Sequence, residues 1–325
     1  MKKLFFLVLV ALSLLFLLMP HSAGAENRNL RTELTMAAGF SSGEFDWNIA
    51  GDLNGENPKI LSELSWTDLS ILQVGAQGRM ILKKDHWKLG GVARGRLVYG
   101  AIVAGQNQDS DYDGDNRTRE FSRSNNLSDS GGVWDVTLGV GPVFFLKGET
   151  FTISPLAGFS YHSQDLRMND GYQTISEGGY APAGYVQQPV GPFHGLDSSY
   201  LAEWEGGWLG CDLEYISSDS LKVYGGVEVH LVHYHAEADW NLRPDLNHPV
   251  SFIQESDEAI GFREIVGVSL GEGRLRVKLE FNYERWHAQN GKDTVYFTDG
   301  SRAVTRLNEA NWESLGGELG LILLF

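Results

Sequence analysis

The chain has 325 residues, and its 42 acidic side chains against 26 lysines and arginines give a formal net charge of −16 at pH 7. Such an acidic chain lacks the basic surface that nucleic-acid phosphates require, so nucleic acid is excluded as a partner. The single cysteine excludes an internal disulfide framework.

The first residues predict export. Two lysines precede an apolar run over residues 4–19, and Ala-Gly-Ala at 23–25 offers a cleavage site. This order is that of a secretory signal peptide. Residues 1–25 are therefore predicted to be removed, and residues 26–325 are predicted to form one domain.

Apolar and polar residues alternate through the rest of the chain, with the period of a strand that has one apolar face. The clearest example is Arg274–Tyr283, where Leu, Val, Leu, Phe and Tyr alternate with charged or polar residues. After residue 26 no apolar run reaches the roughly 20 residues that a spanning helix needs. We predict ten strands, at approximately residues 30–48, 60–82, 87–104, 133–146, 150–167, 199–215, 220–237, 258–270, 274–287 and 308–325.

The connections between these strands alternate in length. Four are tight turns, at residues 84–85, 147–149, 217–219 and 272–273. Five are long, at residues 49–59, 105–132, 168–198, 238–257 and 288–307. Short turns on the periplasmic side and long external loops are typical of outer-membrane barrels. The sequence thus predicts an all-β fold, a ten-stranded antiparallel transmembrane β-barrel in the outer membrane of a Gram-negative-type bacterium, in contact with lipid and lipopolysaccharide.

The last predicted strand ends on an aromatic residue. Leucines alternate with glycine and polar residues from Leu315 onward, and the sequence ends at Phe325. This ending resembles the assembly signal of outer-membrane proteins. We therefore expect the barrel-assembly machinery to recognise Phe325.

A barrel of ten strands is narrow, so side chains are expected to fill its lumen. The residues predicted to face inward carry both signs and can neutralise one another; they are Arg31, Glu33, Glu63, Arg79, Arg94, Arg96, Asp135, Glu228, Arg263, Arg274, Arg276, Lys278 and Glu280. Nine tryptophans mostly lie at or near strand ends, where some are expected to form interfacial girdles. A wide diffusion pore is not expected, and a narrow channel stays open as an alternative.

The stretch DSDYDGD at residues 109–115 places four aspartates on alternate positions. A calcium loop, a catalytic carboxylate pair and a solvated acidic loop are the three hypotheses. The calcium pattern is matched by Asp109, Asp111, Asp113, Gly114 and Glu120. Strands are predicted on either side of the stretch, whereas a calcium loop of this kind has flanking helices. Three arginines between residues 117 and 123 supply countercharges.

The catalytic hypothesis comes from a family resemblance. LSELSW at residues 61–66 on the second strand, and DSDY at residues 109–112 after the third, resemble the omptins, which are outer-membrane endoproteases of Gram-negative bacteria. The order of strands and loops is similar over the whole mature chain. The resemblance implies that Asp109 and Asp111 activate a water against a peptide, together with an Asp-His dyad from the fourth external loop.

The fourth predicted loop departs from the omptin pattern. Asp239 is followed by Trp240 and Asn241, so asparagine stands where that pattern has histidine. The candidate partners for the aspartate pair are then Asp239, His235 and His248. Without a base aligned by a carboxylate, water activation loses its main source.

The runs NQDSDY at 107–112 and EFSRS at 120–124 also resemble omptin-like barrels of chlamydia-related and environmental bacteria. We predict a non-proteolytic barrel with a surface-binding, structural or narrow channel-like role. The alternative is an aspartyl-type, omptin-like endopeptidase acting on extracellular peptides or proteins.

Two histidines at the predicted rim share one face of a strand. His233 and His235 are two residues apart, so their rings lie on the same side. Two imidazoles without a third ligand are a weak signal for a metal.

Overall fold

The computed structural model describes residues 30–83, 87–181, 188–192 and 194–325. The predicted signal peptide at residues 1–25 and the predicted turn at 84–85 lie outside these ranges. Within these ranges, no helix is long and apolar enough to cross a membrane. The described residues form twelve strands, which are β1 (Leu30–Ile49), β2 (Ser62–Lys83), β3 (Leu89–Gly114), β4 (Thr118–Leu127), β5 (Gly131–Leu146), β6 (Phe151–Ser176), β7 (Gly191–Pro192), β8 (Asp197–Ile216), β9 (Leu221–Asp239), β10 (Phe252–Leu270), β11 (Leu275–Tyr296) and β12 (Arg302–Leu324). Two 3-10 turns, η1 (Asp115–Arg117) and η2 (Lys147–Glu149), complete the elements of these ranges.

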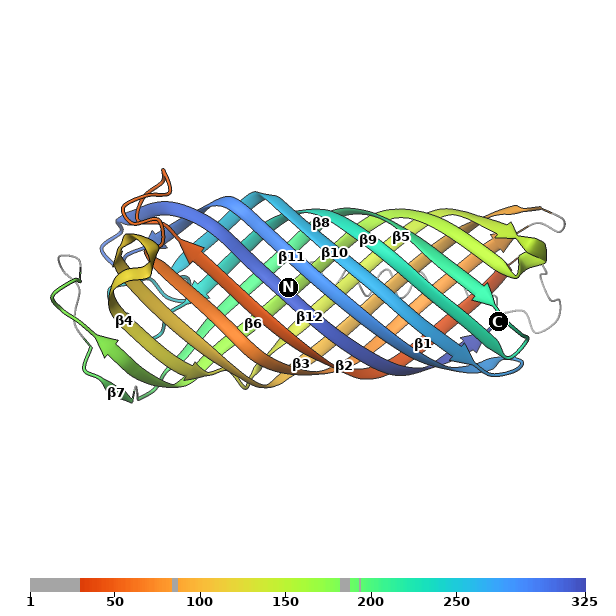
Figure 1. Ribbon diagram of the computed structural model, residues 1–325, viewed down its shortest axis with the longest axis horizontal. Coiled ribbons are helices and arrows are strands. Elements are labelled where there is room, and N and C mark those ends of the chain that lie inside the picture. The colour runs from red at the N-terminus through yellow and green to blue at the C-terminus, as the bar shows by residue number, and fades with distance from the viewer. Residues whose placement is uncertain (1–29, 84–86, 182–187, 193) are drawn as a thin grey trace.

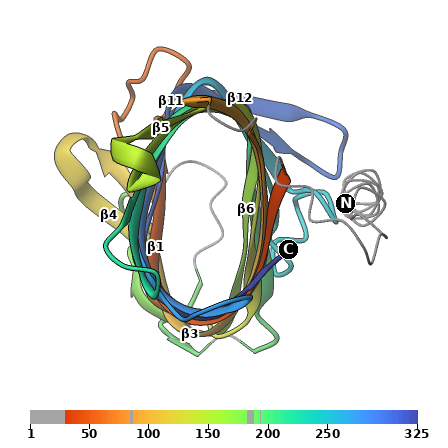
Figure 2. The same ribbon diagram turned by 90° about the vertical axis from the view of Figure 1, so that its right-hand side faces the viewer.

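Ten of these strands close into one antiparallel ring, in the order β1-β2-β3-β5-β6-β8-β9-β10-β11-β12 and back to β1. Figure 1 shows the tilted strands of the wall, and Figure 2 shows the oval ring seen along the barrel. The predicted antiparallel β-barrel is confirmed. Its predicted ten strands correspond to the ring, and the described residues hold two more, β4 and β7, within predicted loops.

β5 begins at Gly131, and at this end of the barrel its neighbouring strands are longer and continue the barrel wall. This end carries the long connections and is called the upper end. β3 and β6 each run for 26 residues, and β4 pairs with both of them. The predicted end of the third strand at residue 104 is therefore wrong, because β3 continues to Gly114 and the chain returns as β4. Residues 105–127 are mostly polar on both faces, so no apolar alternation marks this hairpin.

Other strands also reach into the predicted loops. β10 begins at Phe252, β11 ends at Tyr296 and β12 begins at Arg302. Figure 1 shows these extensions and the β3–β4 hairpin at one end of the barrel, and the short turns and the C-terminus at the other. The alternation of short and long connections is thus confirmed. The long connections contain fewer residues than predicted, because the strands extend into them.

Exposed apolar side chains form a belt around the outside of the ring. On β3 they extend from Leu89 to Val103, and the outward residues beyond them, Gln106 and Gln108, are polar. Other members of the belt are Met36, Phe40, Val74, Val140, Phe159, Leu209, Val229, Leu231, Ile260, Val266, Val277, Leu279, Phe281, Leu315, Leu319 and Leu321. A belt of this size matches the lipid-facing surface of a transmembrane barrel. The wall above the belt therefore stands outside the bilayer.

Ion pairs fill the lumen inside the belt. Arg263 Nη2 lies 2.8 Å from Asp135 Oδ2 and 2.5 Å from Glu284 Oε1. Arg94 Nη1 lies 2.8 Å from Asp212 Oδ1. Further pairs join Arg79 and Glu214, Lys222 and Glu214, Arg96 and Asp135, Lys278 and Glu280, and Lys278 and Glu318. The expected network of mutually neutralising luminal charges is present, but the prediction that Glu63 belongs to it is wrong, because Glu63 lies on the opposite face of β2 from the buried Leu64 and pairs with Arg117.

Aromatic side chains fill the upper lumen. We refer to these buried residues as the aromatic plug: Phe45, Trp47, Trp66, Tyr200, Trp204, Tyr234, Phe252, Trp286 and Trp312. The ring centroid of Tyr200 lies 5.4 Å from that of Trp66 and 5.5 Å from that of Phe45. Most of the tryptophans near strand ends therefore pack inside the barrel instead of facing the interface. They reach the lumen because they share the inward face of strands that extend above the belt.

A chain of hydrogen bonds links Tyr200 of the plug to Gln254 and Asp293. The Tyr200 hydroxyl donates to Gln254 Oε1 at 2.6 Å, and Gln254 Nε2 donates to Asp293 Oδ1 at 3.0 Å. Asp293 lies far above the last apolar belt residue of its strand, Phe281. Burial raises the pKa of Asp293 to about 7, against a smaller opposing effect of the hydrogen bond from Gln254.

The substitution Asp293→Asn is expected to flatten the pH dependence of stability. The folded state favours the protonated carboxyl, so this contribution to stability is complete below about pH 4 and is lost as the pH rises through 7. Urea unfolding of the variant and the wild type at pH 5 and pH 8 measures the difference. The variant should gain stability relative to the wild type at pH 8, and an equal pH dependence of the two proteins would contradict the assignment.

Candidate functional site at the barrel mouth

Asp109 and Asp111 lie on β3, where β2 and β4 flank it. Asp109 is paired with Leu64 on one side and Ser124 on the other. Leu64 is buried against the aromatic plug, and directly paired residues share one face of a sheet. Both aspartates therefore face the lumen at the mouth of the barrel. The prediction that they lie in a loop is wrong, because they belong to an extended strand.

The two carboxylates form a half-buried pair. Asp109 Oδ1 is buried and has no hydrogen-bond partner among the described residues. Burial raises the pKa of Asp109 well above its usual value, and the charge of Asp111 adds to this effect. Burial also raises the pKa of Asp111, against smaller opposing effects of Ser62 and Arg243. Two such carboxylates lose their protons in separate steps, so one of them keeps its proton to higher pH.

Arg243 is the positive charge that acts on this pair. It lies in the connection between β9 and β10, and it holds Asp245 with two hydrogen bonds, Nε to Oδ1 at 2.9 Å and Nη2 to Oδ2 at 2.8 Å. The hydrogen bond that Arg243 donates to Asp245 is the largest influence raising the pKa of Arg243, and the charges of Asp109 and Asp111 contribute. The sequence analysis missed this residue. The available signal was that Arg243 is the single arginine or lysine in residues 238–257.

Asp239 and His248 come together in the same connection. His248 Nδ1 lies 2.6 Å from Asp239 Oδ1, and His248 Nε2 lies 3.2 Å from the backbone oxygen of Arg243. The hydrogen bond to Asp239 raises the pKa of His248. Both ring nitrogens face acceptors, as in an imidazolium ion that donates twice. In this arrangement His248 has no free nitrogen to accept a proton from water.

The other predicted partner, His235, is not at the mouth. It lies on the outward face of β9, with Nδ1 3.4 Å from Glu255 Oε1 and Nε2 3.3 Å from Glu237 Oε1. The structure thus brings Asp109 together with Asp111, and Asp239 together with His248. The barrel wall separates His235 from the aspartate pair, whereas Asp239 lies on the same outward face of β9 as His235.

Arginines hold two of the four predicted calcium ligands. Asp113 Oδ2 lies 3.6 Å from Arg119 Nη1, and Glu120 accepts two hydrogen bonds from Arg123, at 2.6 and 2.8 Å. In the described part of the chain, Asp109, Asp111, Asp113 and Glu120 form no group of three with converging ligand atoms. Calcium binding here stays an untested prediction that this geometry does not favour.

The substitution Arg243→Gln is expected to raise the pKa of the Asp109 and Asp111 pair further, because it removes a positive charge that lowers both values. A carboxyl infrared titration, with Asp109→Asn/Asp111→Asn as the spectral reference, measures the shift. Arg285→Gln, on the exposed outer face of β11, is the matched control. The prediction fails if Asp109 and Asp111 titrate at the same pH in the wild type, in Arg243→Gln and in Arg285→Gln.

The family model of the Protochlamydia outer membrane protein, Pom, matches residues 35–325. The chain belongs to this family. It is therefore an outer-membrane protein, in agreement with the closed ring and its apolar belt. A comparison with curated proteins gave no match.

Solved outer-membrane barrels are similar to this member of the Pom family in fold. The outer membrane protease OmpT from Escherichia coli matches with a TM-score of 0.65 and 14% identity, over 94% of this chain and 99% of OmpT. The predicted omptin-like architecture is confirmed. The translocator domain of NalP from Neisseria meningitidis (TM-score 0.32, 12% identity, 94% and 90% coverage) and Ail from Yersinia pestis (0.28, 8%, 90% and 98%) score too low to bear on this fold.

Proposed function

We propose that this chain is a closed, non-proteolytic outer-membrane barrel that acts by surface binding or as a structural element of the membrane. The observation that carries the proposal is the filled lumen. Ion pairs around Arg263 occupy the part inside the belt, and the aromatic plug occupies the part above it. A general pore requires a continuous path of water through the lumen. The ion pairs and the aromatic plug block such a path.

The electrostatics of the mouth support the non-proteolytic part of the proposal. An arginine, Arg243, acts on the aspartate pair, and an arginine does not give up its proton in proteins. The one Asp-His pair formed by the predicted partners uses both imidazole nitrogens in hydrogen bonds. The described residues of the mouth therefore place two carboxylates beside a fixed cation, and none of the predicted histidine partners offers them a free nitrogen.

The surface available for binding is the wall above the belt together with the connections at that end. We assign lipid and lipopolysaccharide to the belt, and extracellular peptides or proteins to the mouth. Export through removal of residues 1–25, and assembly through Phe325, belong to the same proposal.

Planar-bilayer recording tests the closed lumen. The refolded wild type is expected to give no resolved conductance steps, because the plug and the ion pairs leave no water column. A trimeric porin in the same bilayer controls for insertion and detection. Steady, ion-selective steps from the wild type would support the narrow channel instead.

An endopeptidase is the second candidate, and the aspartate pair on β3 favours it. Two carboxylates that share one proton can supply an acid and a base without histidine. Beyond the effect of burial, the charge of Asp111 raises the pKa of Asp109, as it would in such a pair, and the fold of the barrel is similar to that of an outer membrane protease. The two candidates differ in one result, which is whether the wild-type mouth cuts peptides.

A further inference from the structure

The outer wall of β9 and β10 carries histidines and carboxylates just above the apolar belt. His233 and His235 lie on β9, and Glu255 lies on β10. The outward residues below them are apolar, and Leu231 and Ile260 are 68% and 46% exposed. The group therefore lies on the part of the wall that meets water, beside the level of the lipid surface.

Strand pairing brings the three side chains to one place. His235 and Glu255 are direct cross-strand partners, and His233 lies two residues along the same face of β9. A bulge between Ser256 and Ala259 adds one residue to β10 at this level. It leaves Asp257 on the outside, where its Oδ1 lies 2.8 Å from His233 Nδ1. Bulges commonly redirect a side chain in this way.

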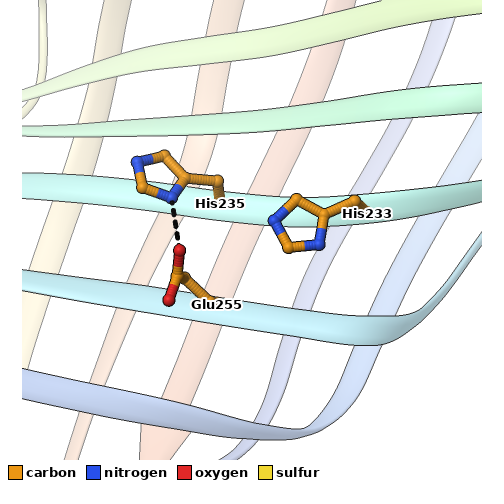
Figure 3. Close-up of side chains that lie close together, drawn as sticks. All are labelled: His233, His235 and Glu255. Carbon is orange, nitrogen blue, oxygen red and sulfur yellow. Dashed lines mark hydrogen bonds and ion pairs between the residues drawn. The ribbon is translucent and has the colours of Figure 1, made fainter.

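We propose that His233, His235 and Glu255 bind a divalent ion of the zinc class. One ligand atom from each residue lies within 4.8 Å of the others. Figure 3 shows His235 Nδ1 directed at the Glu255 carboxylate and the ring of His233 beside them. Ligands of a tetrahedral zinc ion are about 3.3 Å apart, given bonds of about 2.0 Å. Small rotations of these side chains bring the ligand atoms from within 4.8 Å of one another to that separation.

The hydrogen bonds around His233 and His235 leave one ring nitrogen of each histidine to coordinate the ion. Asp257 occupies His233 Nδ1, so Nε2 of that ring is left to coordinate. Metal-binding histidines commonly donate their other nitrogen to a carboxylate in this way. Glu237 contacts His235 Nε2 at 3.3 Å, which leaves His235 Nδ1 beside Glu255. Two imidazoles and one carboxylate, with the remaining positions open to water, form a ligand set for zinc.

The ligand types select the ion. Imidazole nitrogens suit zinc and similar transition metals, whereas calcium takes oxygen ligands. The outer wall on the β8 side is acidic, because β8 places Glu203 opposite His235 and Glu205 opposite His233, while on the other side β11 places one lysine, Lys292, opposite Glu255. The acidic charge raises the local concentration of cations of every kind. Selectivity for zinc over calcium therefore depends on the two histidines.

A second group in the described ranges has converging ligand atoms, and its charges are already paired. Asp135, His162 and Glu284 lie buried in the lumen. Arg263 contacts both of their carboxylates. A metal ion there would have to displace a buried arginine, whereas no arginine or lysine pairs with the exposed Glu255 among the ion pairs of the described residues.

Calorimetric titration of the refolded full-length barrel in detergent with ZnCl₂, and separately with CaCl₂, tests the proposal. We expect one saturable zinc site per barrel in the micromolar range and no saturable calcium site. Glu255→Gln keeps the shape of the side chain and should weaken zinc binding at least tenfold. His233→Ala/His235→Ala should abolish the saturable site. His287→Ala, an outward histidine on β11 that contacts Asn311, should leave it unchanged.

Circular dichroism establishes that each variant is folded, and zinc-edge X-ray absorption of the wild type supplies a readout without mutation. The proposal requires two imidazole ligands in that spectrum. It is overturned if wild-type zinc binding is absent, if the double histidine variant retains it, or if the spectrum contains no imidazole. These outcomes are independent of conductance and of peptide cleavage, so they do not depend on the proposed function.

Discussion

Replacing Arg263 with methionine is expected to lower the free energy of unfolding by about 3–5 kcal/mol, because removal of one member of a buried ion pair leaves uncompensated charges. Arg263 is 1% exposed. Its Nη2 lies within 2.8 Å of both Asp135 and Glu284, and its Nη1 lies 3.8 Å from Glu228. The variant leaves Asp135 and Glu284 with Arg96 as the cation they still share, at the longer distances of 3.3 and 3.9 Å.

Urea unfolding of the barrel in lipid vesicles measures this loss. Arg285→Met is the matched control, because Arg285 lies on the exposed outer face of β11, where a charge contributes about 1 kcal/mol or less. A double variant that also replaces Glu284 with glutamine should recover part of the stability. If Arg263→Met and the control lose equal stability, the luminal ion pairs do not hold the barrel together.

The second large effect is expected in the aromatic plug. Trp204→Ala should cost about 3–5 kcal/mol, the range for truncating a buried aromatic side chain. Trp204 is fully buried, and its ring centroid lies 4.5 Å from that of Tyr234. Its Nε1 donates to Gln164 Oε1 at 3.0 Å, so the variant also leaves a buried amide without its partner.

Trp134→Ala is the comparison for this prediction, because Trp134 is 43% exposed on the outside of the barrel. Its loss should be clearly smaller in the same unfolding measurement. Trp204→Phe should retain more stability than Trp204→Ala, because part of the cavity stays filled. Equal losses at Trp204 and Trp134 would indicate that the upper lumen is not packed.

Much of the ring could be predicted from residue alternation. Lipid on one side and charges on the other enforce a strict pattern, as in Arg274–Tyr283. The β3–β4 hairpin could not be predicted in this way, because water and polar neighbours surround both of its faces. The plug was missed for a related reason. An aromatic residue near a strand end suits both the membrane interface and a luminal core, and only the strand pairing decides between them.

The candidate sites were visible in part. The spacing of Asp109 and Asp111 marks a carboxylate pair, but its position opposite Arg243 depends on how the β9–β10 connection folds. His233 and His235 mark two ligands. The third, Glu255, is 20 residues from His235 in sequence, and it becomes a neighbour only through the antiparallel pairing of β9 and β10.

Cleavage of a panel of basic peptides by the refolded barrel, with lipopolysaccharide present, is the most direct test of the central claim that the mouth does not hydrolyse peptides. OmpT from Escherichia coli is the positive control. Asp109→Asn/Asp111→Asn is the matched variant. We predict that OmpT cuts and that neither the wild type nor the variant does. Cleavage by the wild type that is lost in the variant would contradict the account and assign the reaction to the aspartate pair.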